Sequence, residues 1–105
     1  MTNEIRILIA DDHAIVRKGL RAVLRNVPDI QVVGEAATGW EAISEAESLQ
    51  PDVVLMDIRM PEMDGLEATR RILAEGGDAI RVIVLTTFDP DEYIYRALQI
   101  GASAF

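Results

Sequence analysis

The chain has 105 residues, a net charge of −8 and 50% hydrophobic residues, which fits one acidic globular domain. It has no cysteine and one histidine, which excludes disulfide scaffolds, thiolate zinc sites and His-rich metal sites. The acidic balance argues against nucleic-acid binding by this domain itself, and no apolar run approaches the roughly 20 residues that span a membrane. The N-terminus carries no basic leader, so we expect a cytoplasmic location.

Apolar, β-branched runs alternate along the chain with segments whose apolar residues recur at helical spacing. This alternation with short connections predicts the α/β class, as a doubly wound parallel sheet with helices on both faces. The predicted elements are, in order, strand 5–10, helix 14–26, strand 30–36, helix 39–50, strand 53–56, helix 65–75, strand 81–85, helix 90–100 and the start of a fifth strand at 102–105.

Two helix starts carry specific capping signals. Thr38 followed by Glu41 has the pattern of a capping box, in which the two side chains satisfy free backbone N–H groups. Asp64 followed by Glu67 has the same spacing and predicts an N-cap at Asp64.

Acidic residues follow two of the predicted strands. Asp11 and Asp12 end the first strand, and Asp57 ends the third. If these strands are neighbours, three carboxylates converge at the carboxyl edge of the sheet, where α/β proteins bind ligands. Carboxylates without nearby Cys or several His favour Mg²⁺, because it prefers hard oxygen ligands. The alternative is that these aspartates merely cap helices or end strands, and that Asp11 or Asp12 caps the first helix.

Five motifs in combination make the chain resemble the receiver domain of a bacterial two-component response regulator. The stretches 12–17 and 85–89 further resemble the LuxR/NarL-type subfamily. The five motifs are Asp11-Asp12, Asp57 after Val-Val-Leu-Met, Met60-Pro61-Glu62-Met63-Asp64-Gly65, Leu85-Thr86-Thr87 and Gly101-Ala102-Ser103-Ala104-Phe105.

The resemblance implies a flavodoxin-like (CheY-like) sheet of order 2-1-3-4-5, here truncated at the start of strand five. Residues 1–105 would form one receiver domain that lacks the end of strand five, the fifth helix and any output domain. Members of this subfamily usually carry a C-terminal helix-turn-helix domain. We therefore expect transcription regulation, with DNA bound only through that absent domain.

The resemblance also assigns roles at the acidic edge. Asp57 matches the phospho-accepting aspartate, which takes a phosphoryl group from a phosphohistidine of a sensor histidine kinase. Asp12 matches a direct Mg²⁺ ligand, Asp11 an acid that acts on the metal mainly through water, and the backbone carbonyl of Arg59 a further ligand. Asp57 itself is also expected to contact the metal.

Two further residues match the switch of the family. Thr86 matches the hydroxyl that bonds a phosphoryl oxygen, with Thr87 as the competing register, and Phe105 matches the switch aromatic of strand five. The resemblance implies homodimerisation on phosphorylation. The family also has a lysine that would fall shortly beyond Phe105.

Other interpretations remain at this point. One is a pseudo-receiver that acts only as a protein docking module, which the missing lysine favours and the acidic residues disfavour. A phosphatase of haloacid-dehalogenase type needs an acid where Arg59 stands. A flavin-binding protein needs a Gly-rich phosphate loop where Asp11 and Asp12 stand. We expect no enzyme activity beyond self-catalysed phosphoryl transfer and dephosphorylation.

The truncation predicts a partly uncovered sheet face. In a sheet of this order the first and fifth helices share one face, so without the fifth helix part of that face is bare. Val54, Met56, Val82 and Val84 are the expected residues of this face, or their strand neighbours if the register differs by one.

Overall fold

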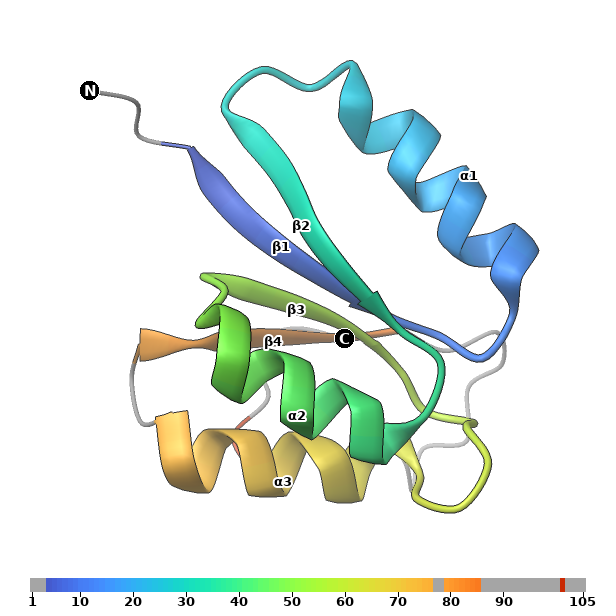
Figure 1. The fold of residues 1–105 in the computed structure, drawn as a ribbon, viewed down its shortest axis with the longest axis vertical. Helices are drawn as coiled ribbons and strands as arrows, with labels where there is room; N and C mark the ends of the chain where they lie inside the picture. The colour runs from blue at the N-terminus through green and yellow to red at the C-terminus, as the bar shows by residue number, and fades with distance from the viewer. Residues whose placement is uncertain (1–3, 77–78, 86–100, 102–105) are drawn as a thin grey trace.

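A parallel sheet of four strands, in the order β2-β1-β3-β4, forms the middle layer of the fold (Figure 1). The structure is a computed structural model that describes residues 4–76, 79–85 and 101. The strands are β1 (Ile5–Ala10), β2 (Ile30–Ala36), β3 (Val53–Asp57) and β4 (Arg81–Leu85). This confirms the predicted fold class and order over these strands. The predicted fourth helix and fifth strand lie outside the described residues.

The three described helices are divided between the two faces of the sheet. α1 (Ala14–Arg25) lies on one face, and α2 (Gly39–Leu49) and α3 (Gly65–Gly76) lie side by side on the other (Figure 1). The chain steps outward from β1 to β2 and then back past β1 to β3, so right-handed crossovers put the helices on opposite faces. Within the described residues, no helix is long and apolar enough to cross a membrane.

Both predicted caps are present. The backbone N–H of Glu41 donates to Thr38 Oγ1 at 3.1 Å, and the Glu41 carboxylate accepts from the N–H of Ala37 at 2.8 Å. The N–H of Glu67 donates to Asp64 Oδ1 at 2.9 Å. These local hydrogen bonds fix where α2 and α3 begin, and therefore how the loops before them leave the strands.

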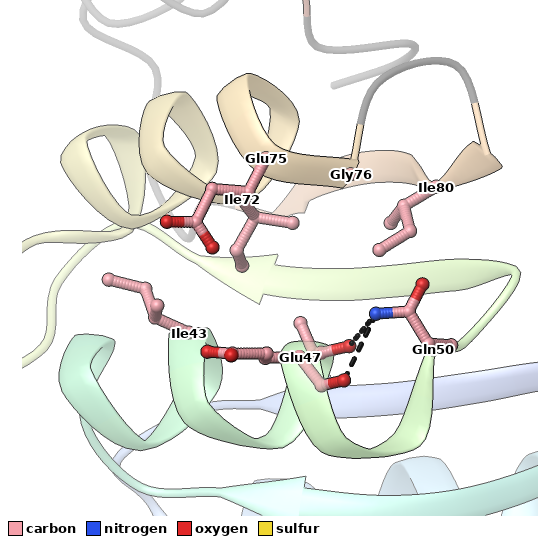
Figure 2. Close-up of a pocket in the computed structure, with 8 residues that line it drawn as sticks. Ile43, Glu47, Gln50, Ile72, Glu75, Gly76 and Ile80 are labelled. Carbon is pink, nitrogen blue, oxygen red and sulfur yellow. Dashed lines mark hydrogen bonds between the residues drawn. The ribbon is translucent and has the colours of Figure 1, made fainter.

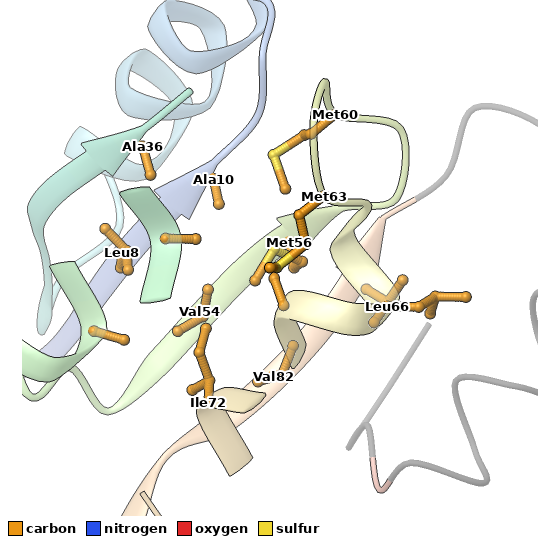
Figure 3. Packing of buried hydrophobic residues seen from close by; sticks show 14 of the residues in the cluster. Leu8, Ala10, Ala36, Val54, Met56, Met60, Met63, Leu66, Ile72 and Val82 are labelled. Atoms are coloured by element: carbon orange, nitrogen blue, oxygen red, sulfur yellow. The ribbon is translucent and has the colours of Figure 1, made fainter. Parts of the chain in front are cut away.

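The main core lies between the sheet and the α2/α3 pair (Figure 3). Val54, Met56, Val82 and Val84 are all fully buried in this core. The expectation that they form the thinly covered face is therefore wrong. Their side chains point towards α2 and α3, because alternate residues of a strand face opposite sides of the sheet.

The opposite face of the sheet is formed by the residues that alternate with these four along β3 and β4. Val53, Leu55, Ile83 and Leu85 are half-buried, which agrees with the alternative register. Within the part of the chain that the structure describes, α1 is the helix over this face, and none of its residues is buried. Its Ile15 side chain is 80% exposed.

A small cavity of about 140 Å³ lies between α2 and α3 (Figure 2). Its lining includes Ile43, Ile72 and Ile80, together with Gln50 and Gly76 at the carboxyl ends of the two helices. These helix ends lead into the starts of β3 and β4, so the cavity is on the amino-edge side of the sheet. It is separate from the acidic residues at the carboxyl edge.

Candidate functional site

The acidic residues meet because their strands are neighbours. Asp11 directly follows β1, Asp57 is the last residue of β3, and Ala10 pairs with Met56 across the two strands. One side-chain ligand atom each from Asp11, Asp12, His13 and Asp57 lie within 4.8 Å of one another. The structure therefore brings the three predicted carboxylates into one cluster and adds His13 to it.

Asp11 is held from several directions. Its Oδ1 accepts hydrogen bonds from the backbone N–H of His13 at 2.8 Å and lies 3.1 Å from His13 Nδ1. Its own N–H donates to the carbonyl of Ala36 at 3.0 Å, and its carbonyl accepts from Arg17 Nη1 at 2.7 Å. Asp11 is only 6% exposed, so its carboxylate has a fixed direction.

Asp12 has an unsatisfied oxygen. Its Oδ1 is buried and has no hydrogen-bond partner, although His13 Nδ1 lies 3.0 Å away at ion-pair distance. A buried carboxylate oxygen without a donor is unfavourable unless a cation or water binds it. The hydrogen bond to Asp11, followed by the charge of Asp12, raises the pKa of His13, so the protonated imidazole is favoured beside the two acids.

Asp57 lies at the end of a buried strand and is 9% exposed. Burial, and then the negative charges of Asp11 and Asp12, raise its pKa to about 6. The carboxylate is therefore ionised at neutral pH at a cost in free energy. A bound cation would relieve this repulsion.

The donor set fits Mg²⁺. The cluster offers carboxylate oxygens, one of them buried and without a hydrogen-bond donor, and Mg²⁺ prefers such hard ligands while retaining several waters. Beside Asp12, a pocket of about 420 Å³ is lined by loop residues that include Arg59 and Asp64, and this space can accommodate those waters.

The loop after β3 is fixed by Gly65. The backbone N–H of Gly65 donates to the carbonyl of Ile58 at 2.7 Å, and a Cβ at position 65 would overlap the carbonyl oxygen of Asp57. The amino end of α3 therefore packs directly against the backbone that carries Asp57. Arg59, whose backbone carbonyl is a predicted metal ligand, is an exposed residue of this loop. Thr86, Thr87 and Phe105 lie outside the described residues.

Sequence reasoning missed the residues that support the cluster. Arg17 and Glu35 are 18 positions apart in the chain, yet Arg17 Nε donates to Glu35 Oε1 at 2.9 Å. The available signal was Glu35 itself, the one charged residue of a strand that is apolar apart from Gln31. Gly65 was assigned only to a motif, although its position after an N-cap residue could have indicated close backbone contact.

A doubly wound sheet with clustered carboxylates at its switch point defines the class of flavodoxin-like proteins with an acidic carboxyl edge. Residues 7–105 match the response regulator receiver domain family, and the chain belongs to this family. It is 48% identical over 101 residues to the transcriptional regulatory protein LiaR of Bacillus subtilis, an alignment that covers 96% of this chain and 47% of LiaR. The chain thus spans about half the length of the curated relatives that it matches.

Solved structures of response regulators also superpose on this chain. A LuxR-family two-component response regulator from Aurantimonas sp. SI85-9A1 superposes with a TM-score of 0.90 at 37% identity, covering 96% of this chain and 71% of that one. A chain from the CheX-CheY-BeF3-Mg²⁺ complex of Borrelia burgdorferi superposes with a TM-score of 0.86 at 28% identity, covering 94% of this chain and 74% of that one. The chain is therefore a receiver domain whose relatives include transcriptional regulators.

Proposed function

We propose that this receiver domain accepts a phosphoryl group on Asp57 from a phosphohistidine of a sensor histidine kinase. A carboxylate oxygen of Asp57 forms a bond to phosphorus as the phosphorus–nitrogen bond of phosphohistidine breaks, and the imidazole leaves with the electron pair. The observation that carries the proposal is the position of Asp57 at the end of β3, beside Asp11 and Asp12. The domain would catalyse only its own phosphorylation and dephosphorylation, so we do not class it as an enzyme.

Each acidic residue has a distinct part in this proposal. Asp57 is the nucleophile and must be ionised, which its pKa of about 6 permits at neutral pH. Asp12, Asp11, Asp57 and the backbone carbonyl of Arg59 would hold Mg²⁺, with Asp11 acting mainly through water. The ion supplies charge neutralisation for the carboxylate and phosphoryl oxygens. The similarity to a chain from the CheX-CheY-BeF3-Mg²⁺ complex supports this part.

The consequence of phosphorylation is proposed from the family. The Thr86 hydroxyl would bind a phosphoryl oxygen, and Phe105 would change its packing in response. This two-state change would promote a homodimer and control a DNA-binding output domain outside residues 1–105. The similarity to the transcriptional regulatory protein LiaR supports a role in the regulation of transcription.

Incubation with acetyl phosphate and Mg²⁺, followed by intact mass measurement, tests the proposal. We expect a gain of one phosphoryl group that is lost in Asp57→Asn and without Mg²⁺. Asp29→Asn is the matched control, because Asp29 is an exposed aspartate with a φ of 68° that asparagine tolerates. No gain in mass with Mg²⁺ present would contradict the proposal and leave a protein docking module as the function.

A further inference from the structure

Arg17 connects the first helix to the end of the first strand. It lies in the first turns of α1, and its Nη1 donates to the backbone carbonyl oxygen of Asp11 at 2.7 Å. The Arg17 side chain is only 18% exposed. This carbonyl belongs to the peptide group that joins Asp11 to Asp12, so the hydrogen bond acts between the two acids of the cluster.

The guanidinium of Arg17 is itself fixed by Glu35. Arg17 Nε donates to Glu35 Oε1 at 2.9 Å, and Glu35 pairs with Ile9 in the β1–β2 ladder. The hydrogen bond from Arg21, reinforced by the one from Arg17, lowers the pKa of Glu35 and keeps it ionised. Arg17 is therefore bound at one end to a charged group on a neighbouring strand and at the other to the Asp11–Asp12 peptide.

We propose that Arg17 is a positioning residue for the cation site: by holding the carbonyl of Asp11, it sets the orientation of the Asp11–Asp12 peptide and so directs the Asp12 carboxylate into the cluster. This inference rests on the proposed function, in which Asp12 is a direct Mg²⁺ ligand. Arg17 touches neither the cation nor the phosphoryl group and acts through the backbone. Groups that orient ligands in this way typically change metal affinity by about 10–100-fold when removed.

Arg21 provides a matched control. It also lies on α1, and its Nε donates to the other oxygen of Glu35 at 2.5 Å. Arg21 makes no hydrogen bond or ion pair with Asp11. Removing either arginine makes the protein more negative by one charge, which by electrostatics alone would strengthen cation binding. The positioning role therefore predicts weaker Mg²⁺ binding in Arg17→Ala only, whereas Arg21→Ala should bind Mg²⁺ as well as the unaltered protein or slightly better.

The test is calorimetric titration of the metal-free protein, Arg17→Ala, Arg17→Lys, Arg21→Ala and Asp12→Ala with Mg²⁺, at a temperature where circular dichroism reports each variant folded. We expect about ten-fold weaker binding in Arg17→Ala and unchanged or slightly tighter binding in Arg21→Ala. Arg17→Lys should also bind more weakly, because lysine lacks the planar fork that serves both acceptors. If Arg17→Ala does not fold, Arg17→Lys decides the question.

A metal-free measurement separates positioning from general loss of structure. The ¹³C carbonyl shift of Asp11 should move in Arg17→Ala and stay in place in Arg21→Ala. Equal Mg²⁺ affinities in the protein, Arg17→Ala and Arg21→Ala, with Asp12→Ala weaker, would overturn this inference and leave the proposed function intact. Equal affinity in the unaltered protein and Asp12→Ala would overturn both.

Discussion

Gly65 lies so close to Asp57 that a Cβ at position 65 would overlap the backbone carbonyl oxygen of Asp57. The amino end of α3 is thereby packed against the end of β3. The position of Asp57, the proposed phospho-acceptor, depends on this contact between two backbones, which only glycine permits without a shift.

We therefore expect Gly65→Ala to destabilise the protein by about 3 kcal/mol, the upper part of the range for overpacked sites. Gly19→Ala is the control, because a Cβ at Gly19 in the middle of α1 would meet no atom within 4 Å. That change should stabilise by about 0.5–1 kcal/mol through helix propensity. Urea unfolding of both variants measures the difference, and equal effects would show that the Gly65 contact is unimportant.

Asp57→Asn should stabilise the protein at pH 7.5. The pKa of Asp57 is raised to about 6 in the folded state from an ordinary 3.8, so the folded state binds the proton more tightly than the unfolded state does. This carboxylate therefore costs stability increasingly as pH rises from about 4 to about 6, and the full cost remains above pH 6.

Thermal unfolding between pH 4 and 8 measures this effect. The melting temperature of Asp57→Asn should exceed that of the unaltered protein above pH 6, and the difference should shrink towards pH 4. Asp29→Asn removes the same charge at an exposed position and should not stabilise. An Asp57→Asn advantage that grows on acidification would contradict the assigned direction of the pKa shift.

Mg²⁺ should bind to the acidic cluster. Its binding should weaken as the pH falls through about 6, because Asp57 takes up a proton there. Saturating Mg²⁺ should raise the melting temperature, because a ligand of the folded state stabilises it by mass action. Chelation should reverse the shift. Melting curves at pH 7.5 and 5.5 test this; a Mg²⁺ effect that is independent of pH would mean that Asp57 does not contribute to the site.

Thr86→Ala should still accept the phosphoryl group but fail to couple it to dimerisation. The coupling needs a contact that differs between the two states, and the variant removes the hydroxyl that would provide it. Sedimentation with and without acetyl phosphate measures the effect. Normal phosphate-dependent dimerisation in Thr86→Ala, with loss in Thr87→Ala, would assign the switch to the adjacent residue.

Local chemistry made much of the fold predictable. The start of α2 follows from Thr38 and Glu41, and the start of α3 from Asp64, since each cap is a hydrogen bond within a few residues. The convergence of Asp11 and Asp57 was predictable because parallel strands end at one edge. These signals depend on neighbours in the sequence or on a simple rule of topology.

Features that depend on side-chain direction or distant pairs were not predictable. Val54 and Val82 were assigned to the wrong face, because strands that are apolar on both sides do not indicate which side two helices cover. The hydrogen bond between Arg17 and Glu35 joins α1 to β2, the strand that follows it, and no local sequence pattern specifies it. Contacts of this kind become visible only once the register of β1 and β2 is known.

The central claim is that Asp57 is the residue that carries the phosphoryl group, and chemical localisation tests it most directly. Borohydride reduction of an aspartyl phosphate leaves homoserine at the modified position. The tryptic peptide 26–59 contains Asp29, Asp52 and Asp57, whereas Asp11 and Asp12 fall in peptide 7–17. We predict homoserine at position 57 alone after treatment with acetyl phosphate and Mg²⁺, whereas homoserine at position 11, 12, 29 or 52, or none at all, would contradict the claim.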